Sequence, residues 1–189
     1  MSNTPSKSNR KNRQVLSIFA GNVLQGAGFG LGCVSLWFST QPNNVPLRVI
    51  AMIAGYLLIY FTSHSSAHYI VGRLGGIMFS HYSMGGSSHA SSYPPVMRQL
   101  FEHLPFFAAH TNSHSLKSAA PTTKALMFGA GIVSTVVVCS LAALFAFRTD
   151  VPGGLTLLIF NGIWQVSSLV AEMRKGGDLA KAVQAFRSS

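Results

Sequence analysis

The sequence predicts an all-α integral membrane protein with about four transmembrane helices. The chain has 189 residues, of which 48% are hydrophobic and only 10% are charged. Soluble domains usually carry about 25% charged residues. The apolar residues also gather in four runs, each close to the roughly 20 residues that a helix needs to cross a bilayer. We therefore expect the lipid bilayer to be the first partner of this chain.

The few charges are strongly unequal, with 14 Lys and Arg against 4 acidic residues and a formal charge of +10. A basic soluble protein would suggest nucleic acid. Here the basic residues lie between long apolar runs, and no nucleic-acid-binding motif is visible, so we expect no nucleic-acid partner. Twelve of them lie before the first run, between the second and third, or after the fourth; the other two are Arg48 and Arg148. The positive-inside rule then places both termini and the long loop between helices 2 and 3 in the cytoplasm.

Residues 1–13 are polar and basic, and we expect them to be disordered. The first span covers about residues 15–38. It is long and lacks a convincing small-residue cleavage site, which favours an uncleaved membrane helix over a signal peptide. Its polar residues Asn22 and Gln25 should face protein. Two pairs with small-xxx-small spacing should allow another helix to approach closely: Gly26 with Gly30, and Gly28 with Gly32.

The second span covers about residues 47–72, and its polar end must face protein or a water-filled cavity. A long, irregular cytoplasmic loop, residues 75–123, follows. Ile77–Tyr82 is rich in strand-forming residues and can contribute to a short β-hairpin. The remaining elements of the four-helix membrane domain, residues 14–175, are spans at about 125–147 and 154–171. Residues 176–189 form a cytoplasmic C-terminal helix or tail.

His64 and His68 stand four residues apart at the polar end of the second span. This spacing puts both imidazoles on one face of a helix, where they can share a divalent metal if further ligands are available. Asp178 should leave the fourth span near the same face of the membrane. The competing interpretations are interfacial histidines bonded to nearby hydroxyls, and a carboxylate that caps a short C-terminal helix. We read the other histidines as loop residues of unassigned role: His81, His89, His103, His110 and His114.

These residues resemble the site-2 protease family of intramembrane zinc metalloproteases. The family carries H-E-x-x-H on a membrane helix, followed by a stretch like A-R-L-x-G-I. Here the sequence reads His64-Ser-Ser-Ala-His68 and then VGRLGGI at 71–77. Residues 125–134 (ALMFGAGIVS) are similar to the family's A-G-P-x-x-N segment without its Pro and Asn. The family's second signature is an Asp in a D-G or G-D setting on a later span, where it supplies the third metal ligand. Asn161 and the Gly-Gly-Asp that ends at Asp178 occupy similar relative places in this sequence.

The resemblance implies a zinc site with His64, His68 and Asp178 as ligands. It does not imply proteolysis, because Ser65 stands where the family has its general-base Glu, and a serine hydroxyl cannot hold a proton near neutral pH. Glu102, in the loop, is the alternative base that could swing into such a site. We therefore assign no catalytic residue and expect a non-proteolytic, metal-binding relative, a pseudoenzyme, in a prokaryotic plasma membrane. A membrane-protein partner or substrate is part of this expectation.

Three alternatives stay open. The chain can be a structural or accessory membrane protein without metal, or a still-active membrane metalloprotease that uses another base. A b-type haem protein is a weaker alternative, because haem ligation needs histidines that face each other across helices. His64 and His68 share one helix, and the first, third and fourth spans contain no histidine.

Overall fold

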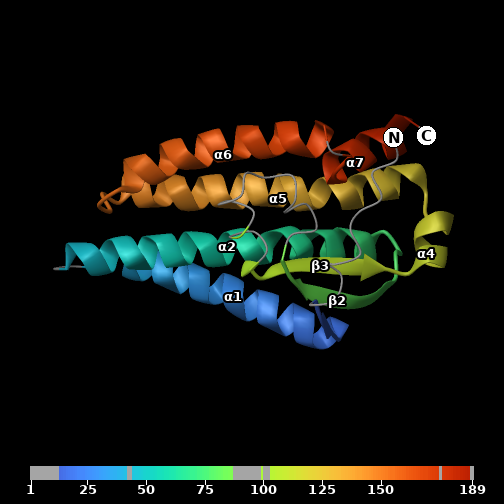
Figure 1. Cartoon of the computed structure of the whole chain (residues 1–189), viewed down its shortest axis with the longest axis horizontal. Coiled ribbons are helices and arrows are strands. Elements are labelled where there is room, and N and C mark those ends of the chain that lie inside the picture. Colours follow the sequence, from blue (N-terminus) through green and yellow to red (C-terminus); the bar gives the residue numbers. More distant parts are fainter. Residues whose placement is uncertain (1–12, 42–43, 87–98, 100–102, 175, 188–189) are drawn as a thin grey trace.

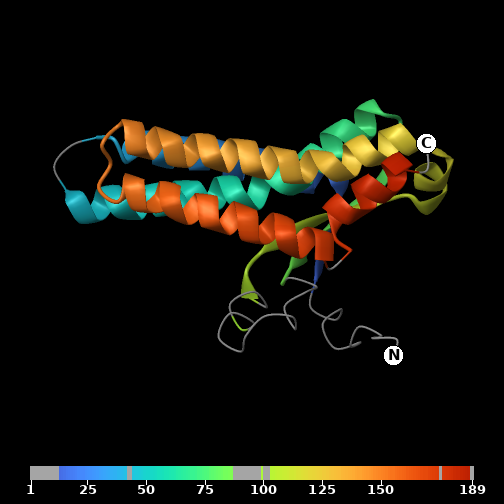
Figure 2. The same ribbon diagram turned by 90° about the horizontal axis from the view of Figure 1, so that it is seen from above.

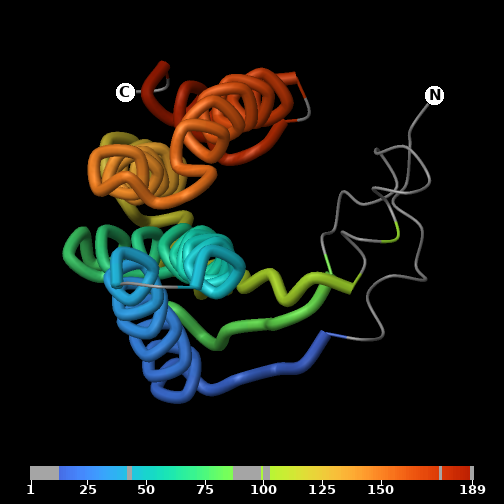
Figure 3. The backbone as a smooth tube through the Cα atoms, turned by 90° about the vertical axis from the view of Figure 1, so that its left-hand side faces the viewer, coloured from blue at the N-terminus to red at the C-terminus, as the bar shows by residue number. Residues whose placement is uncertain are grey.

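Four long apolar helices dominate the computed structural model, which describes residues 13–41, 44–86, 99, 103–174 and 176–187. Each is long and apolar enough to cross a membrane, as the sequence predicted. They lie roughly side by side in the order α1, α2, α5, α6 (Figures 1 and 3), so α2 and α5 form the centre of the bundle. The bounds are α1 Ile18–Phe38, α2 Val45–Leu74, α5 Pro121–Arg148 and α6 Gly154–Arg174.

The first span begins three residues later than expected, at Ile18 rather than Val15. Ser17 is the N-cap, and its side-chain oxygen accepts a hydrogen bond from the Ala20 N–H at 3.1 Å. The residues before it, Gln14–Leu16, form strand β1 instead of helix. The correction has a physical reason: the backbone of β1 pairs with another strand, and a capped helix can start only after it.

The contact between α1 and α2 uses one of the two expected glycine pairs. A Cβ on Gly28 would lie 2.7 Å from Thr62 Cγ2, and one on Gly32 would lie 2.8 Å from Ile59 Cγ1. By contrast, Gly26 and Gly30 have nothing within 4 Å of such a Cβ. Close helix approach through small residues is the usual packing mode in lipid, where apolar burial between helices gives little advantage.

Polar residues of the first span face protein, as predicted. Gln25 is 1% exposed, and its side-chain carbonyl accepts a hydrogen bond from Ser66 Oγ at 3.1 Å. Asn22 accepts one from the hydroxyl of Tyr82 at 2.9 Å. Tyr82 is fully buried, and burial raises its pKa to about 12. The contact of Gln25 with Ser66 joins two membrane helices, and the contact of Asn22 with Tyr82 attaches the sheet described next to the first helix.

The loop between α2 and α5 is not irregular where the structure describes it. It contains strands β2 (Phe79–Gly85) and β3 (Phe106–Thr111) and the short helix α4 (Ser113–Ser118). The expected hairpin pairing is present, since β2 pairs antiparallel with β3. Strand β1 adds on the other side, giving the order β1-β2-β3. Figure 2 shows this sheet projecting from one side of the bundle.

The C-terminal segment forms helix α7 (Asp178–Arg187), which follows α6 after a short turn. It packs against the start of α5, at the same end of the bundle as the sheet (Figure 1). The opposite end contains the tight α5–α6 turn and a core of small and apolar side chains from α2 and α5, among them Ile59, Cys139 and Ala143. The end with α7 is therefore where segments from across the chain converge.

Candidate functional site

Two imidazoles and one carboxylate meet at the end of the bundle that carries α7. The Nε2 atoms of His64 and His68 lie 3.1 Å apart. Asp178 Oδ2 lies 3.1 Å from His68 Nε2 and 3.5 Å from His64 Nε2. The structure thus brings together the three residues that the sequence analysis named. Among the described residues, they form a group whose geometry could hold a metal ion.

Helix geometry and one turn explain how the three residues meet. His64 and His68 are one turn apart on α2, which continues as a single helix to Leu74. Asp178 is the first residue of α7, and the preceding turn passes through Gly176 with a φ of +68°. Glu172 Oε2 accepts the backbone N–H of Asp178 at 2.6 Å and so fixes where α7 begins.

The interpretation of Asp178 as a helix cap does not fit this geometry. Its Oδ2 faces the two histidines, and its Oδ1 accepts a hydrogen bond from Lys181 Nζ at 2.8 Å. Burial raises the pKa of this carboxyl, but the polar groups that face it, His64, His68 and Lys181, outweigh burial and hold the pKa well below its ordinary value. The carboxylate is therefore ionised at any physiological pH.

The Nδ1 nitrogen of each imidazole lies within hydrogen-bonding distance of a residue of helix α5. His68 Nδ1 lies 2.6 Å from the carbonyl oxygen of Met127, which can only accept, so we assign the ring hydrogen to Nδ1. His64 Nδ1 lies 3.1 Å from Thr135 Oγ1. The hydroxyl of Thr135 already donates to the Gly131 carbonyl at 2.9 Å, so its oxygen accepts from His64 Nδ1–H. When neutral, both rings are thereby set in the tautomer that leaves a lone pair on Nε2.

Three acceptor atoms consequently converge on one point: two Nε2 lone pairs and a carboxylate oxygen. Such an arrangement is repulsive unless a proton or a cation lies between the atoms. A tetrahedral zinc site with bonds of about 2.0–2.1 Å places its ligand atoms about 3.3 Å apart. The three observed separations of 3.1, 3.1 and 3.5 Å bracket that value. Outer hydrogen bonds to each ligand are also typical of metal-binding histidines.

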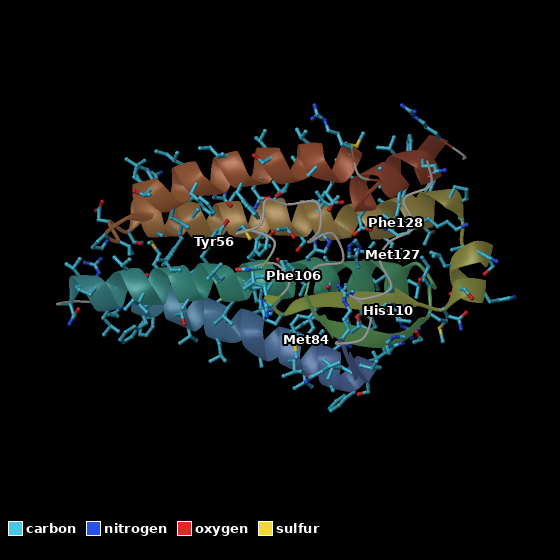
Figure 4. The ribbon with its side chains drawn as sticks, viewed as in Figure 1. Tyr56, Met84, Phe106, His110, Met127 and Phe128 are labelled. Carbon is cyan, nitrogen blue, oxygen red and sulfur yellow. The ribbon has the colours of Figure 1, made fainter. Side chains whose placement is uncertain are left out.

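Residues 125–134, which the resemblance singled out, do lie against the histidines. A Cβ on Gly131 would lie 2.3 Å from His68 Nε2, so only glycine leaves room for this ring (Figure 4 labels the nearby Met127). Asn161 does not join the site. It accepts a hydrogen bond from the Tyr56 hydroxyl at 2.8 Å and donates one to Ser140 Oγ at 3.1 Å, within the bundle.

The structure does not place Ser65 as a base. Ser65 is 2% exposed, and its hydroxyl donates to the Phe107 carbonyl at 2.5 Å. Glu102 lies outside the described residues. Glu172, which sequence reasoning gave no role, lines a cavity of about 220 Å³ together with His64. The only signal that could have drawn attention to it is its position six residues before Asp178.

The loop histidines form no second metal group among the described residues. His81 and His110 belong to strands rather than to loop, and their rings stack at 4.4 Å with an interplanar angle of 11°. Burial, with His81 and Arg13 nearby, lowers the pKa of His110. His114 lies in α4 and His103 is exposed, whereas His89 lies outside the described residues.

Comparisons of the chain with models of known protein families, with curated proteins and with solved structures found no match.

Proposed function

We propose that this protein is a multi-pass membrane protein that binds zinc through His64, His68 and Asp178. The observation that carries the proposal is the convergence of three acceptor atoms whose outer partners fix both imidazole tautomers. Imidazole nitrogen with one carboxylate suits zinc better than calcium or magnesium, which prefer all-oxygen sites. By the positive-inside rule, the site lies toward the cytoplasmic side.

A distant relation to the site-2 proteases is part of this proposal. It is supported by the histidine spacing and by the contact of His68 with the segment 125–134. Because the Ser65 hydroxyl is held by the Phe107 carbonyl, this residue has no role as a base. The proposed role is therefore metal binding without proteolysis, directed at a membrane-protein partner.

The test is the zinc content of the full chain, purified in detergent without a polyhistidine tag and dialysed after loading. We expect about one zinc per chain, and a near-complete loss in Asp178→Asn, which keeps the side-chain shape but removes the charge. His114→Ala, an exposed histidine of α4, is the matched control and should retain zinc. Wild-type protein that holds no more zinc than Asp178→Asn would refute the proposal.

A second candidate function is hydrolysis within the membrane with Glu172 as the base. It is favoured by one observation: Glu172 and His64 line the same cavity. A carboxylate is the usual proton acceptor in such chemistry. Zinc-loaded protein would be incubated with membrane-spanning peptides and the products identified by mass. Cleavage that is lost in Glu172→Gln, with zinc content unchanged, would establish this function; cleavage that persists in this variant would exclude Glu172 as the base.

A further inference from the structure

We propose that the cavity beside His64 binds a compact aromatic group, carried by a ligand whose oxygen-donor head reaches the metal. This inference rests on the proposed zinc site and adds the class of molecule that the site recognises. It is derived from three features of the cavity: its position, its aromatic lining residues and its polar lining residues.

The cavity lies between α2, β3, α5 and α6 and has a volume of about 220 Å³. His64 belongs both to its lining and to the metal group. A tetrahedral zinc with three protein ligands keeps one position for an outside ligand. A ligand seated in the cavity is therefore next to a residue that holds the metal.

Five aromatic residues line the cavity: Tyr60, Phe61, Phe106, Phe107 and Trp164. Phe61 meets Phe106 edge to face, with ring centroids 5.2 Å apart and an interplanar angle of 80°. Tyr60 and Trp164 meet at 6.5 Å and 66°. Figure 4 shows Phe106 at the start of β3, beside α2.

Edge-to-face arrangements of this kind favour a further aromatic ring over a linear chain. Aromatic pairs gain from the attraction between ring edges and faces in addition to the area that they bury. A flexible alkyl chain gains only the burial and loses more conformational freedom when it is bound. The aromatic lining residues therefore favour a phenyl-sized group over a lipid acyl chain.

Part of the cavity lining is polar. It includes His64, Thr135, Gln165 and Glu172. A zinc ion held by three protein ligands keeps one coordination position, which an oxygen donor such as a carboxylate or hydroxamate can occupy. A ligand with an oxygen-donor head and an aromatic group matches both the polar and the aromatic lining residues.

The experiment measures binding of three hydroxamic acids to the zinc-loaded full chain in nanodiscs. The probes are acetohydroxamic acid, 3-phenylpropionohydroxamic acid and octanohydroxamic acid. We expect the phenyl compound to bind about tenfold or more tightly than the acetyl compound, and more tightly than the octyl compound. Metal-free protein should lose the tight binding of all three, which separates the cavity from partitioning into lipid.

Two variants on α5 form a matched pair. Val136 lines the cavity, so Val136→Phe should fill it and abolish the preference for the phenyl compound. Val137 is 48% exposed on the outside, so Val137→Phe should leave the preference unchanged. Phe106→Ala serves as a second test, and it should weaken binding of the phenyl compound several-fold without altering zinc content.

The outcomes separate the two proposals. Absence of zinc from the wild-type protein refutes the metal site itself. Zinc-loaded protein that shows no preference for the phenyl compound, or that prefers the octyl compound, overturns the inference about the cavity alone. A preference that survives both Val136→Phe and Phe106→Ala, with zinc bound, also overturns it.

Discussion

Replacement of Thr135 by Val should weaken zinc binding although Thr135 is not a ligand. Thr135 is 8% exposed, and its oxygen accepts the Nδ1–H of His64 at 3.1 Å. Valine has nearly the same shape but no acceptor, so the substitution leaves this N–H without its partner and frees the ring to turn. Loss of such an outer partner typically costs 10–100-fold in metal affinity.

We expect the lower end of that range, about tenfold or roughly 1.4 kcal/mol. The side chain of His64 is 35% exposed, so water can partly replace the lost acceptor. The assay is competition for zinc with a chelator of known affinity, in detergent. Thr62→Val is the matched control, because the Thr62 hydroxyl donates to the Leu58 carbonyl within α2, away from the imidazoles. Equal zinc affinity for Thr135→Val and wild type, within about twofold, would refute the tautomer assignment on which the site depends.

Two further predictions test the packing around the site and the bundle. Gly131→Ala should displace the ring of His68 and abolish zinc binding, because the new Cβ would lie 2.3 Å from Nε2; Gly129→Ala, which meets nothing within 4 Å, should bind zinc normally. Similar zinc content in both alanine variants would contradict this placement of the ring. Tyr56→Phe should destabilise the bundle by about 0.6 kcal/mol, the average for hydrogen bonds between membrane helices, and by at most about 1.7 kcal/mol, because it removes the bond to Asn161. Reversible unfolding in mixed micelles would measure the difference, and a value near zero would indicate that water replaces the tyrosine hydroxyl.

Composition was sufficient to predict the four helices, because a membrane span needs only length and apolar character. The error at the start of α1 shows the limit of that reasoning. Val15 is apolar enough to extend the span, but the backbone of residues 14–16 pairs with Tyr82–Met84. Pairing between segments so far apart in the sequence leaves no local pattern. The sheet was therefore anticipated only as a hairpin.

The histidine pair could be found from the sequence because helix periodicity is local. Asp178 was named through the family resemblance and through membrane topology, and helical periodicity does not relate it to the histidines. Of the two residues that hold the rings, Thr135 could not be found at all, and Met127 was reached only as part of the segment 125–134 that the resemblance singled out. They lie 71 and 59 residues from their histidines, on a helix whose apolar sequence gives no reason to single them out.

For the proposed zinc site, the separation between its three residues along the chain has a consequence for biosynthesis. His68 and Asp178 are 110 residues apart, and the α5–α6 hairpin is made between them. A nascent chain that has inserted only its first hairpin would expose two imidazoles without their acid, and would hold zinc weakly. Tight zinc binding would then begin only after the second hairpin has docked on the first. Under zinc starvation the two hairpins would separate more easily and would be more exposed to membrane quality-control proteases.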